Sequence, residues 1–119
     1  MKEYSIDECY KDILIGNKIN RNDISKNYKL SEEFIEKFQD KINWKYISKN
    51  YNLSEKFIEE FKDNLYWYYI SIYQTLSESF IEKYQNRVDW ECISIHQTLS
   101  EQFMEKFKDK AHWSYIFKY

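Results

Sequence analysis

The residues of this chain best suited to chemistry are pairs of glutamates that recur at one spacing. Within each pair the two residues stand four apart, which places both carboxylates on the same face of a helix. Paired carboxylates can serve acid–base catalysis, but a repeated pattern indicates a surface, because an active site normally breaks such symmetry. We call this set the glutamate ladder: Glu32, Glu36, Glu55, Glu59, Glu78, Glu82, Glu101 and Glu105.

Two interpretations of the glutamate ladder stay open. The first is an acidic surface that binds a basic partner by resembling a nucleic-acid phosphate array. Asp40, Asp63 and Asp109 extend the ladder by one turn and bring the number of carboxylates to eleven. The second is a lattice of ion pairs between neighbouring units, which the near-zero net charge of each repeat favours. Its basic residues would be Lys37, Lys41, Lys83, Arg87, Lys106 and Lys110.

A second candidate surface comes from two positions that change from repeat to repeat while their neighbours recur. Changing positions in repeat proteins often lie on the binding surface. Tyrosine is favoured at interfaces because it offers area, few rotatable bonds and a polar tip. The alternative is that these side chains pack between adjacent helices. The candidate partner-binding residues are Tyr46, Tyr69 and Tyr73, and the matching positions elsewhere hold Asp23, Asn27, Asn50, Cys92, His96, Tyr115 and Tyr119.

Cys92 and His96 stand four apart, a spacing that suits a metal site or an activated thiol. No third ligand is evident, and the other repeats carry aspartate, tyrosine or asparagine at the same two positions. The chain also has no glycine-rich phosphate loop, no His-Glu-x-x-His motif and no nucleophile elbow. We therefore predict a protein that is not an enzyme, with no catalytic residues, no metal site and no cofactor.

The elements that position these residues follow from a 23-residue repeat. Trp44, Trp67, Trp90 and Trp113 are spaced 23 residues apart. A fixed period in this range indicates stacked units, each of which buries its apolar face against its neighbours. We divide the chain, as a single domain, into an N-terminal cap (1–20), repeats 21–43, 44–66, 67–89 and 90–112, and a terminal half-repeat (113–119).

Each repeat is predicted to contain two short helices. In the unit 44–66, Asn43 can cap a first helix of about eight residues and Ser54 a second of about ten. Leu53 and Ile58 stand five apart, as a hydrophobic staple requires. Ser48 recurs on the first helix and offers a small residue for close approach between helices. The predicted fold is all-α: a short α-solenoid of the right-handed type with a helical N-terminal cap, in which stacking stabilises helices that are marginal alone.

Composition limits the classes of partner and of compartment. The formal net charge is -2, which argues against a general polyanion binder. Two cysteines do not make a disulfide framework, and neither a signal-peptide run nor a membrane span is present in the sequence. We expect a soluble protein in the cytoplasm, with no membrane partner.

Two recurring segments of the repeat have a specific pattern. Residues 44–48 read Trp-Lys-Tyr-Ile-Ser, and residues 53–58 read Leu-Ser-Glu-Lys-Phe-Ile. They resemble a 23-residue tandem repeat of giant DNA virus and bacteriophage proteins, whose pattern is Asp-Trp-x-x-Ile-Ser followed by Leu-Ser-Glu-x-Phe-Ile. Asp89 matches the family's aspartate, whereas Asn43, Tyr66 and His112 replace it. The resemblance covers residues 21–119 and implies a small viral or phage protein that acts on a host or defence component.

The leading functional prediction is a non-enzymatic protein-binding module that binds and blocks a host or defence protein, in the host cytoplasm if the protein is viral. Its partner would be a protein, basic or nucleic-acid-binding if the glutamate ladder is used. One alternative is a single-stranded nucleic-acid binder that stacks bases on Tyr46, Tyr68, Tyr69 and Tyr73, although it lacks a basic groove. Another is self-association through the C-terminal end around Trp113 and Ile116.

Overall fold

A computed structural model describes residues 30–110 of the chain. In this range the protein contains seven α-helices and no strand. The helices are α3 (Glu32–Lys37), α4 (Trp44–Asn50), α5 (Glu55–Glu60), α6 (Trp67–Tyr73), α7 (Glu78–Lys83), α8 (Trp90–His96) and α9 (Glu101–Lys106). The predicted cap (1–20), the first helix of the unit 21–43 and the half-repeat 113–119 lie outside the described residues.

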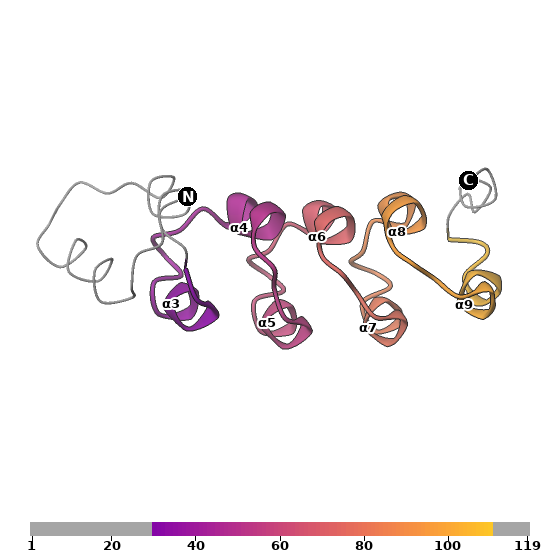
Figure 1. Ribbon diagram of the computed structural model, residues 1–119, viewed down its shortest axis with the longest axis horizontal. Coiled ribbons are helices and arrows are strands. Elements are labelled where there is room, and N and C mark those ends of the chain that lie inside the picture. The colour runs from indigo at the N-terminus through magenta and orange to yellow at the C-terminus, as the bar shows by residue number, and fades with distance from the viewer. Residues whose placement is uncertain (1–29, 111–119) are drawn as a thin grey trace, which may run out of the picture.

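The helices form two rows, as Figure 1 shows. Helices α4, α6 and α8 lie in the upper row, and α3, α5, α7 and α9 lie in the lower row. Within the upper row α4 packs against α6 and α6 packs against α8. The units 44–66, 67–89 and 90–112 each contribute one helix to each row, and their upper-row helices pack in sequence, which confirms the predicted all-helical repeat solenoid.

Side chains cap most of the helix N-termini. Ser31, Ser54, Ser77 and Ser100 accept from the backbone N–H three residues ahead and begin the lower-row helices. Asn43 and Asp89 do the same for α4 and α8, whereas Tyr66 at the start of α6 makes no side-chain cap. Such caps satisfy backbone donors that have no partner inside the helix. Each helix therefore begins at the residue after its predicted cap.

The lower-row helices are shorter than the ten residues predicted. α5 ends at Glu60, and the N–H groups of Asn64 and Leu65 both donate to the carbonyl of Phe61. This turn carries Leu65 back into the core, where it is 6% exposed. Burial of that leucine side chain, and of Ile42 and Val88 at the matching positions, explains why the helix stops where it does.

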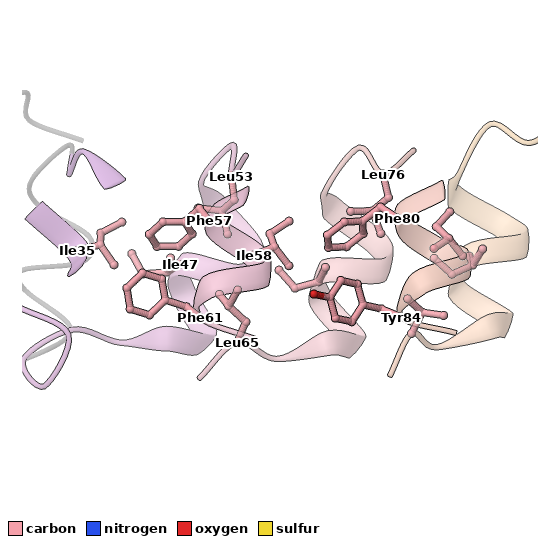
Figure 2. Close-up of a cluster of buried hydrophobic side chains, with 14 of the residues drawn as sticks. Ile35, Ile47, Leu53, Phe57, Ile58, Phe61, Leu65, Leu76, Phe80 and Tyr84 are labelled. Atoms are coloured by element: carbon pink, nitrogen blue, oxygen red, sulfur yellow. The ribbon is translucent and has the colours of Figure 1, made fainter. Parts of the chain in front are cut away.

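The core is one continuous row of apolar side chains between the two helical rows. Figure 2 shows it running from Ile35 through Ile47 and Ile58 towards Phe80 and Tyr84. Every described helix except α9, where Met104 takes its place, has one fully buried isoleucine: Ile35, Ile47, Ile58, Ile70, Ile81 and Ile93. Since no helix here exceeds seven residues, this shared core must supply most of the stability.

Tryptophan and serine tie each upper-row helix to its surroundings. The Trp67 ring lies 5.4 Å from the ring of Tyr84, and its Nε1–H donates to the carbonyl of Lys62 at 2.8 Å. Ser71, which is fully buried, donates to the carbonyl of Trp67 at 2.7 Å and accepts from the N–H of Asp89 at 3.0 Å. The serine thus ties α6 by a hydrogen bond to Asp89, the residue that caps α8, a role beyond the close approach that its small size predicted.

Candidate interaction surfaces

The first glutamate of a ladder pair caps the next repeat. The Glu55 carboxylate accepts from the N–H of Ser77 at 2.6 Å and from its hydroxyl at 2.9 Å. Glu32 makes the same two bonds to Ser54, and Glu78 makes them to Ser100. These carboxylates are half-buried and bind the neighbouring helix N-terminus, so they are part of the stacking contact.

The second glutamate of a pair forms an ion pair with the next repeat. Glu59 pairs with Lys83 and also accepts from the hydroxyl of Tyr84 at 2.9 Å. These two bonds hold the pKa of Glu59 below its ordinary value, and the same ion pair raises the pKa of Lys83. Glu82 pairs with Lys106 in the same way. One turn later Arg87 contacts Asp63 at 2.7 Å.

This series of ion pairs is broken between the units 21–43 and 44–66. In the repeat register Glu60 occupies the position of Lys83, and Glu36 occupies the position of Glu59. Partial burial raises the pKa of Glu60, and the charge and hydrogen bond of Glu36 raise it further. Two carboxylates therefore face each other at this junction, where the following junctions have a carboxylate and a lysine.

The structure thus divides the glutamate ladder. Six of its members make hydrogen bonds or ion pairs to the next repeat: Glu32, Glu36, Glu55, Glu59, Glu78 and Glu82. Glu101 is exposed, and within residues 30–110 Glu105 forms its ion pair with Lys108 of its own repeat, at 3.6 Å. The inter-repeat lattice accounts for the positions of the central glutamates, and a partner that used them would have to displace these contacts.

Tyrosines gather on the upper row at α6. The ring of Tyr69 lies 5.4 Å from Tyr68, 6.2 Å from Tyr73 and 6.4 Å from Tyr66, centroid to centroid. Tyr66 is 51% exposed, Tyr68 55% and Tyr73 47%. Four aromatic side chains, three from α6 and one from the residue before it, therefore form a patch that solvent reaches. Of the other candidate residues, Tyr46 packs instead against Tyr51 of its own repeat, at 6.3 Å.

Two lysines of α4, the helix before α6 in the upper row, border this patch. The Nζ of Lys45 lies 5.6 Å from the centre of the Tyr69 ring, and the Nζ of Lys49 lies 5.7 Å from that of Tyr73. These are cation–π distances. We call the six residues together the tyrosine face: Lys45, Lys49, Tyr66, Tyr68, Tyr69 and Tyr73. In it the sequence-predicted Tyr69 and Tyr73 lie together.

Sequence reasoning left Tyr66 out of the candidate surface, although a signal was present. The residue before the repeat tryptophan is Asn43 or Asp89 in the neighbouring units, where it caps a helix. Tyr66 gives up that cap and stands 51% exposed instead. A lost helix cap and a gained exposed ring mark this repeat as different from its neighbours.

Two glutamines that the sequence analysis did not single out clamp the repeats together. The Gln74 amide donates to the carbonyls of Ser48 at 3.0 Å and Tyr51 at 2.6 Å, and accepts from the N–H of Leu53 at 3.0 Å. Gln97 repeats this pattern one unit later. The recurring tetrapeptide Gln-Thr-Leu-Ser, at 74–77 and 97–100, was the available signal. Each clamp satisfies carbonyls at the end of an upper-row helix.

Cys92 and His96 do not form a reactive pair. Cys92 is buried, and burial followed by its contact with Asp89 raises the pKa of its thiol to about 11. The thiol is therefore protonated at neutral pH, whereas a nucleophilic cysteine needs a lowered pKa. His96 is exposed at the end of α8. Among residues 30–110 the structure shows no cluster of three or more metal-ligating side chains.

No protein-family model, curated protein or solved structure matches this chain. The resemblance to viral and phage repeats therefore stays a prediction from sequence motifs. Within the part of the chain that the structure describes, no helix has the length and apolar character needed to span a bilayer.

Proposed function

We propose that this protein is a protein-binding helical-repeat module and that the tyrosine face is its binding surface. One observation carries the proposal: Tyr68 and Tyr73 of α6, and Tyr66 just before that helix, are each about half exposed. Clustered exposed aromatic rings are typical of protein interfaces, where they fill pockets of the partner. The corresponding positions 23 residues later hold Asp89, Glu91 and His96, so the patch is not a requirement of the stack.

The proposed mechanism is occlusion. The stack holds α6 in place through α4, α8 and the core beneath, so its tyrosines present a fixed surface with little entropy left to lose on binding. A partner surface covered in this way is blocked without any chemical step. The resemblance to viral and phage repeats makes a host protein, met in the host cytoplasm, the partner that we would expect first.

Single-stranded nucleic acid is the second candidate, and the two lysines beside the tyrosines favour it. Base stacking, however, needs open ring faces. Tyr69 stacks on Tyr73 at an interplanar angle of 23°, and the ammonium groups of Lys45 and Lys49 both lie over the Tyr69 ring. These contacts occupy ring faces of Tyr69 and Tyr73 that bases would need, and they support the protein partner over the nucleic acid.

The proposal is tested by capture from a nuclease-treated host lysate with three forms of the protein. The forms are the wild type, the double variant Tyr68→Ala/Tyr73→Ala, and a control, Glu33→Gln/Glu105→Gln, altered in the lower row. We expect one stoichiometric protein with the wild type and the control and none with the tyrosine variant. Equal capture by all three forms would contradict the proposal, and recovery of nucleic acid alone, without nuclease, would favour the second candidate.

A further inference from the structure

We propose that the tyrosine face binds an acidic segment of its partner protein, in which two carboxylates engage the ammonium groups of Lys45 and Lys49. The inference rests on the proposed function, because it assigns a chemistry to the partner of that same face. It follows from how charge is distributed between the two rows of the stack.

The lysines of the tyrosine face differ from the basic residues of the lower row. Lys83, Arg87 and Lys106 each form an ion pair with a carboxylate of the preceding repeat. Within residues 30–110 no carboxylate forms an ion pair with Lys45 or Lys49, whose recorded contacts are with tyrosine rings. The net charge of -2 therefore hides a local positive charge on the proposed binding surface.

The tyrosine rings hold these ammonium groups without neutralising them. Lys49 lies 6.0 Å from the centre of Tyr69 and 5.7 Å from that of Tyr73. A ring face attracts a cation, yet the three N–H donors of a lysine still prefer an oxygen acceptor. Exposed tyrosine hydroxyls beside them can donate to the same carboxylates. The face therefore offers several donors and one sign of charge, to which an acidic segment is complementary.

The spacing of the two lysines sets the spacing of the carboxylates. Lys45 and Lys49 stand one helical turn apart on α4, with Cβ atoms about 5–6 Å from each other. Acidic residues two apart in an extended segment, or four apart in a helix, have a similar separation. In the next units the position of Lys45 is held by Tyr68 and then by Glu91. Among α4, α6 and α8 these two positions are positively charged on α4 alone, which suits a short acidic segment and not a long polyanion.

The experiment is a selection from a yeast-displayed library of random peptides, about 12 residues long, against the full chain. We expect the enriched peptides to carry paired Asp or Glu residues at the two spacings above. Their affinities are then measured by fluorescence anisotropy with the wild type, with Lys45→Gln/Lys49→Gln, and with Lys56→Gln/Lys110→Gln. The last variant makes the same charge change at exposed lysines outside the tyrosine face.

We expect the Lys45→Gln/Lys49→Gln variant to bind the acidic peptides about tenfold more weakly, and the control to bind as the wild type does. Raising the salt from about 50 to 300 mM should remove most of that difference. Enriched peptides without acidic residues, whose binding needs Tyr68 and Tyr73 but neither lysine, would overturn this inference and leave the proposed function standing. Binding that also ignores the two tyrosines would overturn both. Tight binding of a labelled single-stranded oligonucleotide, lost with the two lysines, would assign the face to nucleic acid and overturn the inference.

Discussion

The glutamates of the lower row recur in every repeat, whereas the exposed tyrosines of the upper row gather at α6, and the two sets also differ in what they contact. Glu55, a representative of the lower row, makes both of its hydrogen bonds to the next repeat. Tyr68 contacts only another tyrosine of its own repeat and is 55% exposed. A polar residue that recurs in every repeat has a stacking role here, whereas a residue found in one repeat is available to a partner. From this comparison we predict effects of substitutions that range from large to small.

The largest effect on stability should come from the glutamine clamp. Gln74→Ala removes three hydrogen bonds of a side chain that is 3% exposed and leaves the Leu53 N–H buried without a partner. We expect the free energy of unfolding to fall by about 2–4 kcal/mol, measured by urea denaturation. Gln85→Ala is the control, because the Gln85 amide bonds only to the carbonyl of Glu82 in its own repeat. An equal loss in both variants would show that the clamp has no special role.

A smaller loss is expected from the cross-repeat cap. Glu55→Ala removes the acceptor of Ser77 at the junction of two repeats and should lower the free energy of unfolding by about 1 kcal/mol. Glu33→Ala is the matched control, since Glu33 also lies in the first turn of a helix but is exposed. Both variants lose the same favourable interaction with the helix dipole. A loss no greater than that of the control would mean that the cap contributes nothing to stacking.

A stabilising change is expected at the junction of the units 21–43 and 44–66, where Glu36 faces Glu60. Glu60→Lys places a lysine opposite Glu36, as Lys83 stands opposite Glu59, and should raise the thermal midpoint modestly. The raised pKa of Glu60 means that the native state holds this proton more tightly than the unfolded chain does. Its contribution to stability is therefore fully present below the ordinary glutamate pKa and is lost as pH rises through the raised value.

That linkage gives a pH test of the same variant. The lowered pKa of Glu59 acts in the opposite sense, because its stabilisation is lost as pH falls. Both the variant and the wild type retain Glu59, so its effect cancels. The difference between their thermal midpoints therefore reports on residue 60 and its interaction with Glu36. We expect this difference to grow as pH rises from about 4 to 6. A difference that stays constant, or shrinks, would contradict repulsion between Glu36 and Glu60.

The smallest effect on stability should come from the tyrosine face. Tyr68→Ala should change the free energy of unfolding by no more than about 0.5 kcal/mol, because the side chain is mostly exposed. The same substitution should weaken partner binding by about tenfold or more, as truncation of an interface tyrosine commonly does. Thermal denaturation and a binding titration on one preparation measure both quantities. A large loss of stability would place Tyr68 in the fold and remove it from the binding surface.

Much of this architecture was predictable because the same sequence pattern recurs in every repeat. The 23-residue period located the helices, and the recurring Ser54 and Asn43 positions located their first residues. The contacts between repeats were harder to predict, since the spacing of Glu55 and Ser77 within the sequence does not show that they meet. The shorter helices also escaped prediction, because burial of Leu65 depends on a core that only the stacked units create.

The candidate surfaces were predictable in part for a related reason. Variation at the positions of Tyr69 and Tyr73 pointed to the upper row, and the structure places both rings in one patch. The contribution of Lys45 and Lys49 comes from a different repeat and depends on how closely α4 packs against α6. Distances across a junction are set by packing and not by sequence spacing, so these lysines could not be assigned beforehand.

The most direct test compares the two rows in one experiment. The unfolding midpoint and the capture of the partner are measured for Tyr68→Ala/Tyr73→Ala and for Glu59→Gln/Glu82→Gln. If the upper row binds and the lower row stacks, the tyrosine variant keeps its midpoint and loses the partner, and the glutamate variant has a lower midpoint and keeps the partner. The opposite result, a glutamate variant that stays equally stable and loses the partner, would contradict this division of roles.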